Sequence, residues 1–226
     1  MSLSNTIINT LFPITCLGCR TEGAYLCPAC FSKLKYIKQQ TCLICGKAKY
    51  NGRICLDHGR ALDNVLAAGF YHDPVLSCLI KKYKYYGVKD IAYILTKYLS
   101  LFWLKYDFKY RSSLVIPAPL SQKRKRLRGF NQAELLAKQF AAAFNYGIEC
   151  DGLIKVKHTK PQAKLKVEKR LTNLKNCFAW VGPNLTSKNI ILIDDVIDTG
   201  STLNECARVL KDNGARKVIG LTIARG

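Results

Sequence analysis

Residues 190–202 read IILIDDVIDTGST, and this stretch is the clearest indication of the fold. Four consecutive aliphatic residues, 190–193, are typical of a strand that is buried on both faces, as in parallel sheets. Residues 201–213 then have apolar side chains at helical spacing, Gly214 ends that helix, and residues 217–224 return as a strand. Strand, helix and strand in this order form a βαβ unit. We therefore expect an α/β domain with a parallel sheet flanked by helices.

The loop that joins this strand to the helix combines acids, hydroxyls and a glycine. In open parallel sheets, ligands bind beyond the carboxyl ends of the strands. The free N–H groups and the dipole at a helix start favour a phosphate there, and Asp194 and Asp195 precede that point at a distance suited to vicinal sugar hydroxyls. The pattern therefore predicts a ribose 5-phosphate site. Its phosphate-binding residues would be Thr199, Gly200, Ser201 and Thr202.

Two other interpretations of the run compete with this one. An acidic strand of this kind also occurs in ATPases, but they need a G-x4-G-K-[ST] loop, which the sequence lacks. Alternatively, Asp194 and Asp195 only cap the next turn.

Cysteines are concentrated at the start of the chain, where seven of the eleven lie before residue 60. Two residues between ligands let a tight turn aim both side chains at one tetrahedral ion, and two such turns complete its shell. We expect two structural zinc ions, with the ligand pairs either in sequence order or interleaved between the sites. Because the paired cysteines then stop, we expect a double zinc-ribbon domain over residues 1–60 and a second domain over 61–226. The expected ligands are Cys16, Cys19, Cys27, Cys30, Cys42, Cys45, Cys55 and His58.

Further elements follow from periodicity and capping. Asp73-Pro74 starts a helix that Gly87 ends, and Asn131 starts another with Glu134 in a capping box. Strands are expected over 65–71 and 114–119, and helices over 89–104 and 168–174. The run 123–128 is expected to be a basic loop. The four scattered cysteines, Cys78, Cys150, Cys177 and Cys206, are expected to be small buried apolar residues.

The run 190–202 closely resembles the motif by which type I phosphoribosyltransferases bind phosphoribosyl pyrophosphate (PRPP). By that resemblance, Asp194 and Asp195 hold the ribose hydroxyls and, indirectly, a Mg²⁺ ion, while residues 199–202 wrap the 5′-phosphate. Asp198 replaces the commonest threonine and is similar to the catalytic aspartate of 6-oxopurine members, which assists proton transfer. This departure leaves open whether a base is accepted.

Other segments resemble the ComF family. They are residues 116–120 with the basic run and 128–132, residues 79–87, and the pattern Lys160-Pro161-Gln162, Arg170, Asn173 and Phe178. The family is associated with natural transformation, which imports single-stranded DNA. The resemblance implies DNA as a partner, with an uptake helicase or inner-membrane channel beside it. It leaves open an active phosphoribosyltransferase, a PRPP-gated DNA-binding protein, and a PRPP-sensing regulator, for which no helix-turn-helix pattern is present.

Charge and hydropathy limit which partners and which location we expect for the protein. The chain has 36 Lys and Arg against 15 Asp and Glu, a net charge of +21, which favours polyanionic partners. No basic leader precedes the first apolar run, and residues 92–106 are too short and too charged to span a bilayer, so we expect a cytoplasmic protein, peripheral to the inner membrane at most.

The basic run suits two tasks, since it would neutralise pyrophosphate beside the site or bind the DNA backbone, unless it is merely a solvated loop. Its expected contacts are Lys123, Arg124, Arg126 and Arg128, and the nearby Lys81, Lys82, Lys84, Tyr83, Tyr85 and Tyr86 offer cations and stacking rings.

Overall fold

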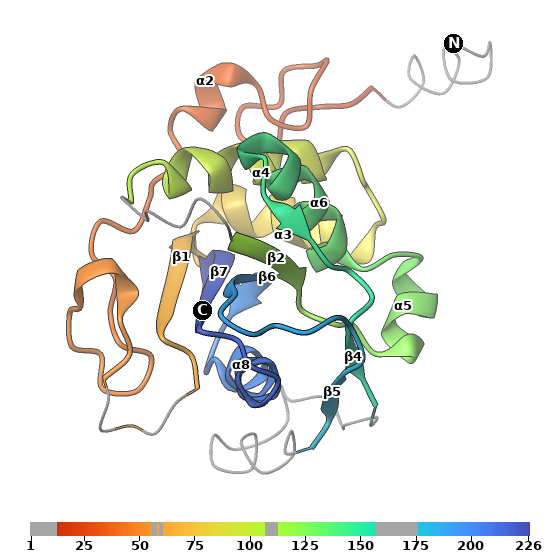
Figure 1. Ribbon diagram of the computed structural model, residues 1–226. Coiled ribbons are helices and arrows are strands. Elements are labelled where there is room, and N and C mark those ends of the chain that lie inside the picture. Colours follow the sequence, from red (N-terminus) through yellow and green to blue (C-terminus); the bar gives the residue numbers. More distant parts are fainter. Residues whose placement is uncertain (1–12, 56–57, 59–60, 107–112, 157–175) are drawn as a thin grey trace.

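The computed structural model describes residues 13–55, 58, 61–106, 113–156 and 176–226. At its centre lies a five-stranded parallel sheet with the order β1-β7-β6-β2-β3 (Figure 1). This confirms the expected α/β architecture. The strands are β1 (Asn64–Phe70), β2 (Ser113–Pro117), β3 (Gly147–Ile148), β6 (Asn189–Ile197) and β7 (Lys217–Arg225).

Helices cover both faces of the sheet (Figure 1). Alternate residues of β6 serve the two sides, with Ile191 and Ile193 packed on one and Ile190 and Leu192 on the other. Because neither face meets water, all four positions are apolar. In the described parts of the chain, none of the helices combines the length and hydropathy needed to cross a membrane. One face carries α3 (Pro74–Tyr85), α4 (Ile91–Trp103) and α6 (Gln132–Phe144), and the other carries α8 (Ser201–Asp212).

Strand β6 runs further than the sequence predicted. The expected strand ended at Ile193, but β6 continues to Ile197, so Asp194 and Asp195 lie within it. Its edge toward β2 stops pairing at Ile193, whereas its edge toward β7 stays paired to Ile197, opposite Arg225. The long neighbour β7 thus keeps the acids extended, and the shorter β2 leaves space beside them.

The capping signals were largely correct. The Asp73 carboxylate accepts the backbone N–H three residues on at 2.9 Å, and Gly87, with φ of 66°, follows the end of α3. Asn131 caps α6 by accepting a backbone N–H at 3.2 Å. The second half of the expected capping box differs, because Glu134 bonds the Lys138 ammonium at 2.7 Å on the helix surface.

The basic run is a short helix rather than the expected loop, α5 (Gln122–Arg128). Ser121 caps it, with its Oγ accepting the Arg124 N–H at 3.4 Å, and Gly129 ends it in the left-handed region at φ 75°. The expectation of a loop took no account of these two local signals, which favour a short helix.

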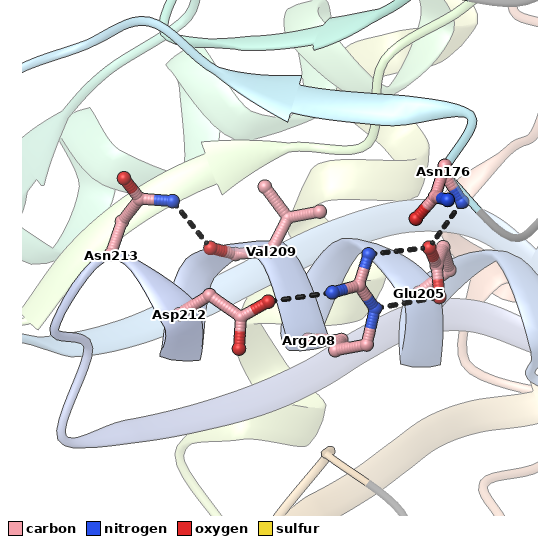
Figure 2. A network of polar contacts seen from close by, with 6 residues as sticks. All are labelled: Asn176, Glu205, Arg208, Val209, Asp212 and Asn213. Carbon is pink, nitrogen blue, oxygen red and sulfur yellow. Dashed lines mark hydrogen bonds and ion pairs between the residues drawn. The ribbon is translucent and has the colours of Figure 1, made fainter.

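A two-stranded antiparallel pair, β4 (Leu153–Lys155) and β5 (Phe178–Trp180), lies beside the carboxyl end of the main sheet. Figure 2 shows how α8 holds the residues that lead into β5. The Glu205 carboxylate accepts the Asn176 backbone N–H at 2.9 Å and also binds Arg208, whose guanidinium lies 2.6 Å from the Asp212 carboxylate. The expected helix 168–174, with Arg170 and Asn173, and the segment Lys160-Pro161-Gln162 lie outside the described residues.

The N-terminal segment packs against the sheet domain and shares its core. It contains α2 (Pro28–Phe31) and the short η1 (Tyr50–Gly52). Leu26 and Leu34 pack with α3 and α4, and Ile37 and Ile54 pack with the α8 side. The Gln40 side chain exchanges hydrogen bonds of 3.0 and 3.1 Å with the Ala67 backbone. The boundary between residues 60 and 61 stays a prediction.

The scattered cysteines divide into two kinds. Cys177 and Cys206 are buried among apolar side chains as expected. For Cys78 and Cys150 the prediction of burial was wrong, because α3 and the turn after β3 leave them only half-buried.

Candidate functional site

A cavity of about 270 Å³ opens at the carboxyl end of β6, where β2 has already ended. The acids Asp194 and Asp195 line one side of it. The cations Arg124 and Arg128 of α5 line another, and Lys155 of β4 completes the wall. Acids and bases thus line one pocket, where Lys84 also pairs with an acid, and this suits a ligand that has both phosphates and a hydroxylated or metal-bound part.

The two acids have different partners. Asp195 is largely buried, and its Oδ1 lies 2.7 Å from the Lys84 ammonium of α3. Burial lowers the pKa of Lys84, but the Asp195 carboxylate outweighs that effect and the net shift is upward. The Asp194 Oδ1 accepts the Asp195 backbone N–H at 2.8 Å. Burial, followed by the neighbouring Asp195 carboxylate, raises the pKa of Asp194 to about 7.

Lys84 was not assigned to this pocket from the sequence, which offered it only as one of several surface cations. The signal was its helical position, because Lys84 lies one turn after Ile80, which is fully buried. Tyr83 is also fully buried, and it donates its hydroxyl to the Gln132 carbonyl at 2.8 Å. This corrects the suggestion that Tyr83 is a stacking ring, because Tyr83 is part of the core.

The loop from β6 to α8 brings the other four predicted residues together. Gly200 has φ of 71° and forms the N-cap of α8, a conformation that glycine adopts without strain. The Thr199 and Ser201 hydroxyls lie 2.8 Å apart, and Thr202 lines the same hollow of about 100 Å³. Asp198 also lines this hollow but is exposed and does not line the larger cavity. Its catalytic role stays a prediction.

The four basic residues of the run do not act as one group. Arg124 and Arg128, one helical turn apart on α5, line the large cavity. Lys123 and Arg126 are exposed on α5 and are not part of its lining. The helical conformation, which the sequence analysis missed, separates a pocket-facing pair from a solvent-facing pair.

The predicted metal ligands form two clusters in sequence order, not interleaved. In each cluster the four ligand atoms lie within 4.8 Å of one another. Three of the ligand pairs, Cys19–Cys27, Cys42–His58 and Cys45–Cys55, are 3.4 to 3.8 Å apart, close to the edge of roughly 3.8 Å of a tetrahedron with zinc–sulfur bonds of about 2.3 Å. The clusters are Cys16, Cys19, Cys27 and Cys30, and Cys42, Cys45, Cys55 and His58.

Local backbone geometry supports metal binding at the first cluster. The Gly18 and Cys27 N–H groups donate to the Cys16 sulfur at 3.4 and 3.3 Å, which stabilises a thiolate. A Cβ at Gly18 would lie 2.6 Å from the Cys30 sulfur, so the turn requires glycine there. Four protein ligands complete a tetrahedral shell, and such closed sites are structural.

The second cluster adjoins the loop between β6 and α8, a contact that the sequence did not reveal. A Cβ at Gly200 would lie 2.5 Å from Cδ1 of Leu43, which directly follows the ligand Cys42. On α8, the Asn204 side chain accepts the Ala61 backbone N–H at 2.9 Å. The metal-binding segment therefore packs directly behind the loop.

Comparison with known proteins agrees with this architecture. Residues 7–58 match a family model described as a double zinc ribbon domain, and residues 128–226 match the phosphoribosyl transferase domain. Among solved structures, glutamine PRPP amidotransferase from B. subtilis aligns with a TM-score of 0.42 and 16% identity, over 62% of this chain and 30% of that one.

Three curated relatives extend over most of the chain. Competence protein F of Haemophilus influenzae is 32% identical, covering 93% of this chain and 90% of the relative. Competence protein ComFC of Bacillus subtilis is 30% identical, covering 88% and 84%. The DNA utilization protein YhgH of Escherichia coli K12 is 29% identical, covering 91% and 94%. This chain therefore belongs to the ComF family, with a double zinc ribbon ahead of a phosphoribosyltransferase domain.

Proposed function

We propose that this protein binds PRPP with Mg²⁺ in the cavity and single-stranded DNA on the basic surface beside it, and that it supports DNA uptake into the cytoplasm. The observation that carries the proposal is that two acids and a hydroxyl-rich loop lie at one strand end, beside a pocket that Arg124, Arg128 and Lys155 also line.

Each part of PRPP has a matching part of the pocket. The N–H groups and hydroxyls of Thr199–Thr202 at the start of α8 would bind the 5′-phosphate. Asp194 and Asp195 would accept the ribose hydroxyls. Arg124 and Arg128 would bind the pyrophosphate, since guanidinium groups pair with phosphate through two parallel hydrogen bonds.

The same acids are the groups that would hold Mg²⁺, directly or through water, because Mg²⁺ prefers oxygen ligands and keeps several waters. A bound Mg²⁺ would neutralise charge on the pyrophosphate. With the ligand bound, the Lys84 ammonium would keep its contact with Asp195 or contact a phosphate oxygen of the ligand instead. Contacts between an ammonium and a phosphate oxygen are usually about 2.7 to 2.9 Å long.

The DNA-binding half rests on charge and on the relatives. The net charge is +21, and the exposed cations Lys123 and Arg126 of α5 lie beside the pocket. The relatives bear the names competence protein and DNA utilization protein. A helicase or channel at the cytoplasmic face of the inner membrane would be the partner that delivers the strand.

A second candidate function, an active phosphoribosyltransferase, is favoured by the part of the cavity lining that the β4–β5 pair contributes. Phe178 and Lys155 from the β4–β5 pair face the space beside the acids, where a planar acceptor would lie. Asp198 would assist proton transfer in that reaction, in which pyrophosphate leaves the anomeric carbon of ribose.

Titration calorimetry with PRPP and Mg²⁺ tests the proposal. Wild type should bind, and Asp194→Ala with Asp195→Ala should abolish binding while the zinc content stays unchanged. Release of pyrophosphate in the presence of nucleobases or single-stranded DNA would establish the enzyme and its acceptor. Normal PRPP affinity in the double variant would refute the site.

Replacing Arg124, Arg126 and Arg128 by Gln tests the DNA-binding surface. The slope of log affinity against log salt should fall by about 2, since each phosphate contact on a single strand contributes about 0.7. An unchanged slope would place the DNA elsewhere on the protein.

A further inference from the structure

The last turn of α3 faces two ways. Lys84 points into the cavity and binds Asp195. The next two residues, Tyr85 and Tyr86, expose 68% and 75% of their surface. Two successive exposed aromatic rings beside a ligand pocket form a surface on which a flat partner could stack.

Cations lie over both rings. The Arg128 guanidinium carbon is 5.3 Å from the centre of the Tyr85 ring, and the Lys82 ammonium is 5.7 Å from that of Tyr86. Such cation–π pairs hold the rings near basic groups. Arg128 also lines the cavity, so the ring of Tyr85 and the pocket share one basic side chain.

The chemistry of this surface selects its partner. Flat apolar rings beside positive charges fit a chain in which flat apolar groups alternate with negative charges, which describes a nucleic acid. In a duplex the base faces are stacked on one another and cannot reach a ring, whereas the bases of a single strand can.

We propose that Tyr85 and Tyr86 form a base-stacking platform for single-stranded DNA at the rim of the cavity. The platform orients the strand so that its backbone follows α5, where Lys123 and Arg126 are exposed. This inference rests on the proposed DNA binding and adds the residues on which unpaired bases would stack.

Two double variants separate stacking from charge. Tyr85→Ala with Tyr86→Ala removes both rings, and Tyr85→Phe with Tyr86→Phe keeps them while removing the hydroxyls. None of the four substitutions changes the charge of the protein, and neither side chain lines the cavity, so PRPP binding serves as a check on folding.

Fluorescence anisotropy would measure binding to three labelled probes: a 15-mer of thymidylate, an abasic strand of equal length, and a duplex. Because stacking on aromatic side chains contributes to the affinity for single strands, the alanine variant should bind the thymidylate strand about 30-fold more weakly than wild type, which corresponds to about 2 kcal/mol. The phenylalanine variant should bind like wild type. The abasic strand should bind wild type and the alanine variant equally.

Several outcomes would overturn the platform. Equal thymidylate binding by wild type and the alanine variant would do so while leaving the proposed DNA binding intact. Equal binding of the thymidylate and abasic strands by wild type would have the same meaning. If the alanine change weakened binding to vesicles of anionic lipid and left DNA binding unchanged, the rings would be a membrane contact. Failure of wild type to bind any strand would refute the DNA-binding function itself.

Discussion

Asp194 offers a test in which stability and function move in opposite directions. Its pKa is raised from 3.8 to about 7, first by burial and then by the Asp195 carboxylate. The folded protein therefore keeps this proton up to about pH 7, whereas the unfolded chain releases it near pH 4. Folding becomes less favourable as pH rises between these values, and the loss is complete above pH 7.

The change Asp194→Asn removes the ionisation but preserves the oxygen that accepts the Asp195 N–H. A shift of roughly 3 pH units corresponds to a ceiling of about 4 kcal/mol at high pH. The variant should gain stability over wild type by about 2 kcal/mol more at pH 8 than at pH 5. It should also lose PRPP binding, because a neutral amide cannot replace a carboxylate at the ribose and Mg²⁺.

The matched change Asp195→Asn should have the opposite effect on stability. It removes the partner that lies 2.7 Å from the Lys84 ammonium and leaves a mostly buried charge with weaker compensation. Losing one partner of such a pair costs about 3 kcal/mol or less where, as here, some exposure remains.

Urea unfolding followed by tryptophan fluorescence at pH 5 and pH 8 measures both effects. The zinc sites are common to the three proteins, so their own pH dependence cancels in the differences. Equal stability of Asp194→Asn and wild type at pH 8 would refute the reasoning. A stability difference between Asp194→Asn and wild type that is the same at pH 5 and pH 8 would also refute the reasoning, because the gain would then come from packing and not from the ionisation of Asp194.

Three other predictions concern the pocket. Leu43→Ala should weaken PRPP binding about 3- to 10-fold with zinc content unchanged, since Leu43 packs behind Gly200 and a few kcal/mol of packing is lost; calorimetry and metal analysis check this. The affinity for PRPP with Mg²⁺ should rise with pH up to about 7, because the metal requires Asp194 to be ionised. Arg128→Gln should weaken PRPP and DNA binding together, which calorimetry and anisotropy would show.

Local signals made much of the fold predictable. The Asp73 cap, the apolar run of β6 and the glycine at position 200 each determine the backbone within a few residues, so the sequence was sufficient for them. The zinc clusters were predictable for the same reason, since two-residue spacing determines how a pair of ligands is aimed.

The errors arose where distant segments determine the outcome. Strand β6 extends through Asp194 because β7 is equally long, and neither fact is visible in the run itself. Lys84 reaches Asp195, 111 positions away by their numbers, through the packing of α3 onto the sheet domain, which no local pattern shows. The helix α5 is an exception, because its serine cap and terminal glycine are local signals that the expectation of a loop overlooked.

The charges of the cavity are out of balance in two places, and both imbalances favour a ligand that carries charges of both signs. At the acidic end, a carboxyl group is held close to neutral because burial and Asp195 oppose its ionisation. At the basic end, burial and then Arg124 lower the pKa of Lys155. A cation would relieve the first effect and an anion the second, so a neutral nucleoside would relieve neither. A sugar that bears pyrophosphate and a divalent ion supplies both charges at once, and this favours PRPP with Mg²⁺ over any uncharged ligand of similar size.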